Sequence, residues 1–303
     1  MWSDRTLPML RQRLVASIRY RSWRLAAAIL PELVVSAAIV MQRHKADIGV
    51  FPNILRPKTF NEKVLHRMLF DRRPIWAQLQ DKYAVREYVK GRIGEQVLPR
   101  LYWVTTTPED IPFGALPDRY VVKPTHASGY IVLVPDKVRL NQQELVETCH
   151  RWLRENYFDR FREWHYKHIV PRIVIEEYID DGTGTVPTDY KLHVFGGRVE
   201  IISVMRARFQ NMRNTLLRRP WTKLDILRGL EQIEEDLVPP PHLETMIEYA
   251  EILAKGLDYL RVDLYDTMNK VYFGELTPTP GAGAQPFQPR EFDHVMGKLW
   301  PTP

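Results

Sequence analysis

Acidic and hydroxyl side chains gather near the end of the chain, in the segment V-Y-F-G-E-L-T-P-T-P-G-A-G from Val271 to Gly283. Its first residues are strong β-formers, which predicts a strand that ends at the prolines and glycines. Residues two apart on a strand share a face, so Glu275 and Thr277 should point the same way. A carboxylate beside a hydroxyl at the end of a strand indicates a metal or phosphate site.

The preceding segment, L-R-V-D-L-Y-D, places Arg261 and Asp263 on one face of a partner strand. A three-residue loop centred on Asn269 would bring Asp263 directly opposite Glu275. Two such carboxylates repel each other unless a cation lies between them. Hard oxygen donors suit Mg²⁺, which takes phosphate oxygens and waters as further ligands, so the pair predicts a magnesium site. Exposure of both side chains at a sheet edge is the alternative.

A lysine and a Ser/Gly loop occur together in V-V-K-P-T-H-A-S-G-Y. Lys123 leaves an apolar strand just before this loop, where a lysine can hold a phosphate while backbone N–H groups surround it. The segment is not a Walker loop, because G-x-x-x-x-G-K-[ST] is absent and strands flank it on both sides. Taken alone, Lys123 could equally be a surface lysine.

Charged residues interrupt two further apolar strands. Glu176 and Glu177 are consecutive in I-V-I-E-E-Y-I, so they face opposite sides and one of them can turn toward the interior. Asp189 and Lys191 share a face of the later segment D-Y-K, and Arg206 ends the strand that returns beside it. Salt bridges would explain each pair, but they explain the whole set poorly.

The elements that must position these residues alternate between strand pairs and single helices from Tyr120 onward. Hairpins are expected around 125–129, at Gly196–Gly197 and between Asp263 and Glu275, a buried strand over 172–179, and helices over 142–153 and 242–255. Asn141 and Glu144 form a plausible capping box for the first of these helices. This order predicts an α+β fold with largely antiparallel sheets.

The region up to residue 95 is expected to be mostly helical. F-N-E-K-V-L-H-R-M-L-F has apolar residues at helical spacing, and Asn61 can cap that helix. A following helix in D-K-Y-A-V-R-E-Y-V-K should bury Tyr83 and end near Gly91. The apolar segment 25–41 is short for a bilayer span and is interrupted by Pro31, so two packed helices are expected, with Pro31 opening the second.

Composition narrows the class of protein. The formal net charge of +6 is concentrated in arginines at the N-terminus and between Arg206 and Arg219, and such patches attract acidic lipid, nucleotide phosphates or an acidic glycan. No zinc-finger spacing or aromatic RNA-binding signature is present, which argues against nucleic acid. The single cysteine, Cys149, excludes an internal disulfide, suits a reducing compartment and should lie in the core.

Six segments in this order resemble the ATP-grasp superfamily, and more closely its TupA-like branch, named for a teichuronopeptide biosynthesis protein. They are T-F-N-E-K, D-K-Y-A-V-R-E-Y-V, V-V-K-P-T-H-A-S-G, R-E-W-H-Y-K-H-I-V-P-R-I-V-I-E-E-Y-I, D-Y-K-L-H-V-F-G-G-R-V, and R-V-D-L-Y-D with Y-F-G-E-L-T-P-T-P-G. The resemblance implies an ATP-grasp fold, in which two α+β subdomains clamp ATP. The expected division is an N-terminal helical region (1–80), a pre-ATP-grasp segment (81–118), a lid subdomain (119–180) and a C-terminal subdomain (181–303).

The resemblance also implies roles for individual positions. Those expected to bind ATP are Lys82 and Lys123 at the phosphates, His126, Ser128 and Gly129 in a lid loop, Glu176, Glu177, Tyr178 and Ile179 as the adenine hinge, and Asp189 at the ribose. Those expected to ligate Mg²⁺ are Asp263, Glu275 and Thr277, although many ATP-grasp enzymes have asparagine at the last position. Those expected to stabilise the transferred phosphoryl and acyl groups are Lys191, Arg206 and Arg261.

The activity that the resemblance implies is ATP-dependent carboxylate–amine ligation through an acyl phosphate. The branch points to amidation of a uronic acid, in a cell-surface polysaccharide or its precursor, with an amino acid or other amine. The protein would act in the cytoplasm, with peripheral membrane contact through its basic N-terminus as an option. A kinase on the same fold and a glycosyltransferase-associated glycan-binding protein are the alternatives, although no convincing D-x-D motif for a nucleotide sugar is present.

Overall fold

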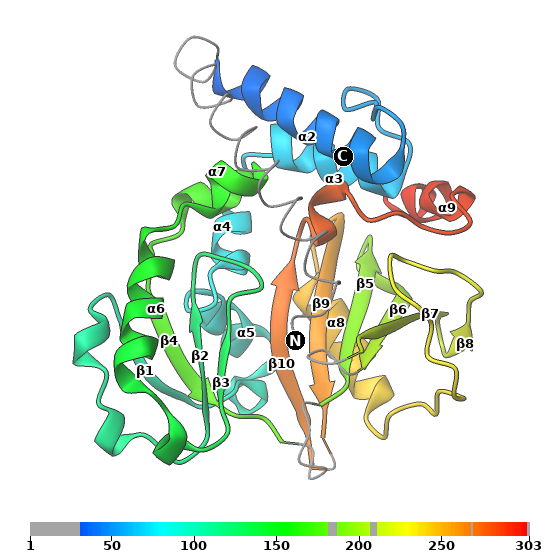
Figure 1. The fold of residues 1–303 in the computed structure, drawn as a ribbon. Helices are drawn as coiled ribbons and strands as arrows, with labels where there is room; N and C mark the ends of the chain where they lie inside the picture. Colours follow the sequence, from blue (N-terminus) through cyan, green and yellow to red (C-terminus); the bar gives the residue numbers. More distant parts are fainter. Residues whose placement is uncertain (1–30, 181–186, 207–210, 268, 302–303) are drawn as a thin grey trace, which may run out of the picture.

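Two antiparallel sheets form the framework of the protein in a computed structural model that describes residues 31–180, 187–206, 211–267 and 269–301 (Figure 1). The smaller sheet has the order β1 (Leu101–Thr105), β4 (Ile173–Glu177), β2 (Tyr120–Pro124) and β3 (Val132–Val134). The larger sheet has the order β10 (Val271–Thr277), β9 (Tyr259–Asp266), β5 (Asp189–Phe195), β6 (Arg198–Arg206), β7 (Arg213–Arg218) and β8 (Thr222–Lys223). The predicted α+β class with antiparallel sheets is confirmed.

The three predicted hairpins are present. Strands β2 and β3 pair around the Ser/Gly loop, β5 and β6 turn at Gly196–Gly197, and β9 pairs with β10. Both glycines of the second turn have positive φ, 55° and 84°, which only glycine adopts at little cost. Strand β1 lies in the segment expected to precede the lid but pairs with β4, so the smaller sheet extends across the expected boundary at residue 119.

Helix α6 (Gln142–Arg154) packs on the smaller sheet. Leu145, Cys149 and Trp152 face the sheet residues Val122 and Ile175 in one apolar cluster. The Asn141 side chain caps the helix by accepting a hydrogen bond from the Glu144 N–H at 3.2 Å. Cys149 is fully buried as predicted, and burial raises the pKa of its thiol to about 12. The thiol is therefore a core group.

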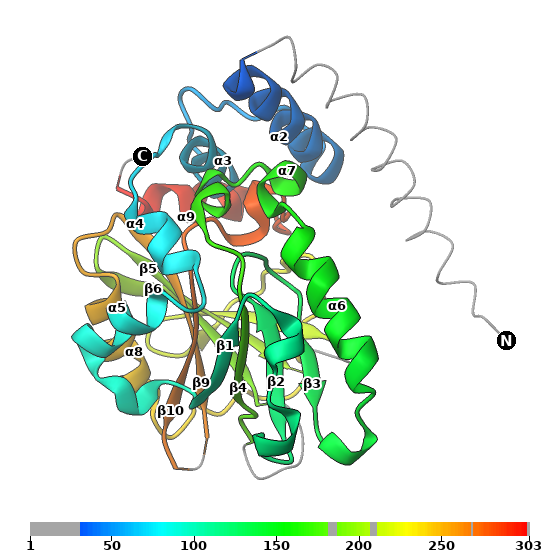
Figure 2. The ribbon, with the colours of Figure 1, turned by 90° about the vertical axis from the view of Figure 1, so that its left-hand side faces the viewer.

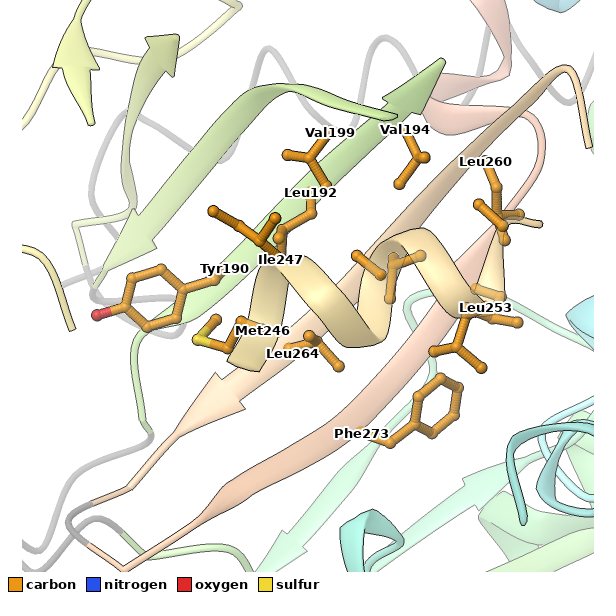
Figure 3. Packing of buried hydrophobic residues seen from close by; sticks show 14 of the residues in the cluster. Tyr190, Leu192, Val194, Val199, Met246, Ile247, Leu253, Leu260, Leu264 and Phe273 are labelled. Atoms are coloured by element: carbon orange, nitrogen blue, oxygen red, sulfur yellow. The ribbon is translucent and has the colours of Figure 1, made fainter. Parts of the chain in front are cut away.

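Helix α8 (Leu243–Leu253) covers one face of the larger sheet (Figure 3). Its Met246, Ile247 and Leu253 pack against alternate strand residues, among them Leu192 and Leu264. Helices α4 (Ile75–Gln80) and α5 (Val85–Ile93) continue this apolar layer beside β10. Because side chains alternate along a strand, the residues between those that face α8 must point to the other side of the sheet.

Helices α2 (Glu32–Ile48), α3 (Phe60–Phe70), α7 (Tyr157–Phe161) and α9 (Glu291–Leu299) gather at one end of the two sheets (Figures 1 and 2). Phe60, Leu65, Tyr259 and Trp300 form the core of this end. Short 3₁₀ segments complete the described structure: η1 (Glu95–Val97), η2 (Pro108–Asp110), η3 (Phe113–Ala115), η4 (Lys137–Arg139), η5 (Trp164–His168) and η6 (Pro280–Gly283). The open side of the larger sheet is therefore roofed at this end by helices and by η6.

Two details of the helical region differ from expectation. Thr59, rather than Asn61, caps α3: its hydroxyl accepts from the Glu62 N–H at 3.2 Å, and the Glu62 carboxylate accepts from the Thr59 N–H at 3.1 Å. Asn61 is buried and donates to Asp293 and to the Gln285 carbonyl, both at 3.0 Å. Tyr83 is 37% exposed rather than buried, because it precedes α5, which begins at Val85.

The N-terminal expectations are tested only from residue 31. Pro31 stands at the N-cap of α2, as predicted for the second helix of the apolar segment. The first half of that segment, and the arginines proposed to contact a membrane, lie outside the described residues. Within the described part of the chain, every helix is too short or too polar to cross a bilayer.

Candidate active site

A cleft lies between the smaller sheet and the edge of the larger one. One wall consists of Val121, Ile131 and Leu133, the opposite wall of Tyr265, Phe273 and Gly274, and the segment Glu176–Ile179 runs along the cleft as the chain leaves β4. Apolar walls beside the polar end of a strand suit a flat heterocyclic ring. The four residues predicted as an adenine hinge therefore line one cavity together.

The two glutamates of this segment have different partners. Glu176 is buried and accepts from Lys123 Nζ at 2.5 Å and from Arg86 Nη1 at 3.1 Å. Glu177 instead accepts from the Tyr272 hydroxyl and from the Arg100 N–H, both at 3.0 Å. The consecutive carboxylates thus point to opposite sides, as strand alternation predicts, and the inner one meets Lys123.

Two lysines stand together farther along the cleft. Lys82 and Lys123 line its continuation with Gln80 and Glu275. Lys82 Nζ donates to the Ala127 carbonyl of the Ser/Gly loop. Burial of its ammonium lowers the pKa of Lys82 to about 8, although the nearby Glu275 carboxylate partly opposes this effect. Two clustered cations with scarce solvent favour a bound polyanion such as a triphosphate.

A network of charged groups covers the face of the larger sheet opposite α8. Lys191 Nζ donates to Asp189 Oδ2 at 2.7 Å and to Asp263 Oδ2. Arg261 donates to both Asp263 oxygens, at 2.6 and 2.7 Å, and its Nη2 also donates to Glu275 Oε1 at 2.7 Å. Burial raises the pKa of Asp263 to about 6, while Arg261 and Lys191 hold it down. One guanidinium thus joins carboxylates from two strands.

Two β-bulges decide which residues enter this network. In the β9–β10 hairpin, Phe273 pairs with Leu264, but Glu275 pairs with Asp263, so Gly274 is an extra residue on β10. A Cβ at Gly274 would lie 2.9 Å from the Asp263 carbonyl oxygen, which explains the glycine. The predicted opposition of Asp263 and Glu275 is therefore confirmed, and the bulge produces it. The expected three-residue loop includes position 268, which lies outside the described residues.

The second bulge removes Arg206 from the network. Val194 pairs with Val199 but His193 pairs with Ile201, so Glu200 is an extra residue on β6 and Met205 lies opposite Asp189. Arg206 therefore projects from the face of the sheet that α8 covers, and its guanidinium donates to Glu235 at 3.0 Å. The prediction that Arg206 acts beside Lys191 and Arg261 is wrong for this reason.

A chamber of about 320 Å³ adjoins the network at the roofed end of the sheet. Arg261, Glu275 and Thr277 form its floor, and Ser128, Tyr157 and Tyr166 belong to its side walls. Arg43 of α2 and Glu163, which precedes η5, supply its remaining charged groups near the reacting end, with Asp47 farther along α2. Because Glu275 and Gln80 also line the lysine part of the cleft, the chamber and the cleft meet at the Arg261–Glu275 pair.

A family model described as TupA-like ATPgrasp matches residues 62–300, which include the whole cleft and charged network. The chain belongs to the TupA-like ATP-grasp family. The resemblance found in the sequence and the ATP-grasp fold are thereby confirmed. In these terms the smaller sheet with α6 is the ATP-grasp lid, and the larger sheet is the C-terminal half of the clamp.

Similar solved structures include three ligases. The D-alanine–D-alanine ligase of Bacillus anthracis complexed with ATP is 19% identical with a TM-score of 0.41, and the match covers 68% of this chain and 56% of that one. The Helicobacter pylori D-alanine–D-alanine ligase is 14% identical with a TM-score of 0.40 and coverages of 75% and 60%. The L-amino acid ligase of Bacillus licheniformis is 15% identical with a TM-score of 0.40 and coverages of 68% and 42%. The chain thus spans less than two thirds of these ligases. No curated protein matches it.

The ATP-grasp lid loop is only partly at the site. Ser128 lines the chamber, and Gly129 is exposed at the loop tip with a φ of 79°. His126 is buried, and its Nε2 lies 2.9 Å from the Trp152 carbonyl oxygen of α6. The structure therefore brings Ser128, but not the His126 ring, to the reaction centre. Asp189 is 2% exposed and bonded to Lys191 in the network, so a contact with the ribose stays a prediction.

The oxygen donors fit magnesium. Asp263 Oδ2 and Glu275 Oε1 each lie 2.7 Å from Arg261 Nη2, and Thr277 Oγ1 lies 2.9 Å from it, so three oxygens converge on one positive centre. Such oxygens are the donors that Mg²⁺ takes beside phosphates and waters. The described residues contain no cluster of three or more His, Cys, Asp or Glu side chains that could hold a metal alone. ATP phosphates and waters would therefore complete the coordination.

Sequence reasoning missed three residues of the chamber. Arg43, Glu163 and Thr279 were not predicted, although R-E-W-H-Y-K-H and T-P-T-P-G belong to the segments that carry the family resemblance. Glu163 accepts a hydrogen bond from the Thr279 hydroxyl. Burial raises the pKa of Glu163 to about 7, against the influence of Thr279, Arg43 and Arg261. A charged residue next to Trp164 was the available signal.

Proposed function

We propose that this TupA-like ATP-grasp protein is an ATP- and Mg²⁺-dependent carboxylate–amine ligase. The observation that carries the proposal is the place of the Arg261–Glu275 pair, where a nucleotide-sized cleft with two lysines meets a separate polar chamber. A phosphoryl group at this junction would be reached from the cleft by ATP and from the chamber by an acceptor. Family membership supports the same reading.

The reaction would take place in two steps. A carboxylate oxygen of the substrate attacks the γ-phosphorus of ATP, and the P–O bond to the β-phosphate breaks, giving an acyl phosphate and ADP. The amine nitrogen then adds to the acyl carbon and loses a proton, and phosphate leaves with the electrons of the C–O bond. Positioning and electrostatic stabilisation account for most of the catalysis in phosphoryl transfer, so the protein itself need not become covalently modified.

The residues at the junction have distinct roles in this proposal. Lys82 and Lys123 hold the phosphates of ATP, with the segment Glu176–Ile179 against the base. Arg261, with Lys191 behind Asp263, stabilises the negative charge that develops on the phosphoryl oxygens and on the acyl oxygen. Mg²⁺, which Asp263, Glu275 and Thr277 would hold together with phosphate oxygens, neutralises charge between the β- and γ-phosphates.

The proposed acid substrate is a uronic acid of a cell-surface polysaccharide or its precursor, used in the cytoplasm. The chamber contains two guanidiniums, Arg43 and Arg261, that suit an acidic substrate. The arginines that follow Arg206 support it less, because Arg213 and Arg219 donate to Glu234 and Glu251 at 2.9 and 2.5 Å. The choice of a uronic acid therefore rests on the family and on the chamber.

Hydroxylamine trapping tests the proposal. The protein is incubated with ATP, MgCl₂, hydroxylamine and a panel of uronic acids, and hydroxamate and ADP are measured. A ligase that forms an acyl phosphate yields both products in equal amounts. A phosphorylated sugar without hydroxamate would instead show a kinase. Failure to bind ATP in calorimetry, at millimolar nucleotide, would contradict both activities.

A further inference from the structure

Two opposite charges in the chamber have no part in the chemistry described so far. Arg43 comes from α2, which lies outside the 62–300 family match, and Glu163 comes from the turn between α7 and η5. They are 120 positions apart in the chain, from the difference 163 − 43, yet they line one cavity with Arg261 and Glu275. Helix α2 therefore adds a cation to a site whose other residues belong to the family core.

The hydrogen bonds of Arg43 use neutral groups. Its Nη1 donates to the Phe161 carbonyl at 3.3 Å and its Nη2 to the Ala282 carbonyl at 3.0 Å. Its Nε is buried and has no hydrogen-bond partner among the described residues. Burial lowers the pKa of Arg43, while the Glu163 carboxylate raises it. A guanidinium fixed by carbonyls with a buried unsatisfied donor is a binding group for an anion.

Helix α2 is held firmly enough to place this cation. His44, the next residue, lies with its Nδ1 2.8 Å from the Gly283 carbonyl oxygen, and Lys167 donates to Glu32 at 2.5 Å at the start of the helix. These contacts join α2 to η6 and to η5, the two segments that flank the chamber. The position of Arg43 thus follows from packing at both ends of the helix.

Glu163 supplies the complementary charge. Its side chain is buried, accepts from the Thr279 hydroxyl and lies 3.7 Å from His165 Nε2. His165 does not neutralise it, because burial lowers the pKa of that imidazole to about 3. Glu163 is within electrostatic reach of both Arg43 and Arg261. A cationic group bound at Glu163 would therefore sit near the reaction junction, with Arg43 available to a second group.

We propose that the chamber binds the amine co-substrate as a zwitterion, with its ammonium group at Glu163 and its own carboxylate at Arg43. This inference rests on the proposed ligase function and narrows the amine to an amino acid. A simple amine would leave Arg43 without an anion, and an acid without an amine would be repelled by Glu163. Both charges are satisfied together only by a molecule that carries the two groups.

Calorimetric titration of amino acids into the full-length protein, saturated with ADP and MgCl₂, tests the inference. The probes are the protein amino acids with D-alanine and D-glutamate, each paired with its carboxamide, which keeps the amine but lacks the negative charge. At least one amino acid should bind, and its carboxamide should bind about tenfold more weakly or worse, a loss typical of one charged hydrogen-bonded contact. Carboxamides that bind as well as the amino acids would overturn the inference.

Variants assign the contact to α2. Arg43→Gln should weaken the amino acid by about tenfold or more, leave its carboxamide unchanged and leave the affinity for ADP unchanged. Lys45→Gln is the matched control, since it removes the same charge from an exposed position of the same helix. Arg43→Lys, which keeps the charge, serves if the glutamine variant does not fold. Normal ADP binding without any amino acid binding contradicts this inference alone, whereas loss of ADP binding by the wild type contradicts the ligase proposal.

Discussion

Glu275 lies directly opposite Asp263 across the β9–β10 hairpin, and Arg261 Nη2 is 2.7 Å from a carboxylate oxygen of each. Two carboxylates at this spacing need a shared cation. In the structure the guanidinium supplies it, and in the proposed reaction Mg²⁺ and the phosphates of ATP would join it. The pair therefore connects the stability of the hairpin to the chemistry proposed for it.

Replacing Glu275 with glutamine should abolish turnover without unfolding the protein. The amide keeps the shape of the side chain but loses the charge that would hold the metal, so kcat is expected to fall about 100-fold or more. Turnover is followed by ADP release and folding by circular dichroism. Glu248→Gln, at an exposed position of α8, is the control and should keep full activity. Wild-type turnover in the Glu275→Gln variant would remove the metal assignment.

ATP binding should take up protons near pH 8. The pKa of Lys82 is lowered to about 8 because its ammonium is buried, so about half of the free protein is deprotonated there. A bound triphosphate favours the charged form and raises this pKa, so binding draws in about half a proton and ATP affinity falls as the pH rises above 8. Calorimetry in two buffers with different ionisation enthalpies measures the uptake. Lys82→Arg, which stays charged, should lose it; an unchanged uptake would exclude Lys82 as its source.

The bulge at Gly274 should tolerate no side chain. An alanine Cβ would lie 2.9 Å from the Asp263 carbonyl oxygen and 3.0 Å from the Tyr265 ring, so the hairpin must shift where it carries the charged network. We expect Gly274→Ala to lower the free energy of unfolding by about 1–3 kcal/mol and to impair turnover. Gly91→Ala, in α5 with no atom within 4 Å of the new Cβ, should be neutral or stabilising by up to about 1 kcal/mol. Equal stability of the two variants in urea denaturation would contradict this account of the bulge.

Thr59 and Asn61 should differ in their effect on stability. Thr59→Ala removes the cap of α3 and should cost about 1 kcal/mol. Asn61→Ala should cost more, because it leaves the buried Asp293 carboxylate and the Gln285 carbonyl without a donor, at about 1–3 kcal/mol. Urea denaturation of both variants gives the comparison. A larger loss from Thr59→Ala would favour the original assignment of Asn61 as a mere cap.

Much of the framework was predictable because it depends on local sequence. The turn at Gly196–Gly197, the cap at Asn141 and the burial of Cys149 all follow from residue type and periodicity over a few positions. Alternation along a strand also put Arg261 with Asp263 and Glu275 with Thr277 on single faces, and the structure joins all four in one network. Local geometry is sufficient for such pairs because strand neighbours are constrained by the backbone itself.

Strand register was less predictable, because one extra residue reverses the faces. Glu200 on β6 turns Arg206 away from Lys191, whereas Gly274 on β10 brings Glu275 opposite Asp263. Nothing in the alternation of β6 announces its bulge, and Gly274 is a signal only once its close approach to β9 is known. The first bulge made a prediction wrong, and the second made one right.

The amino-acid sequence by itself determined the α+β class, the family, the hairpins and the residue types able to handle phosphate and metal. Only the tertiary structure decided that Arg43 and Glu163 line one chamber with Arg261, and that His126 faces α6 instead of the cleft. The physical reason is the range of the interactions involved. Strand and helix patterns arise from neighbours in the chain, whereas the chamber is made by packing α2, η5 and η6 together, and no local period encodes that contact.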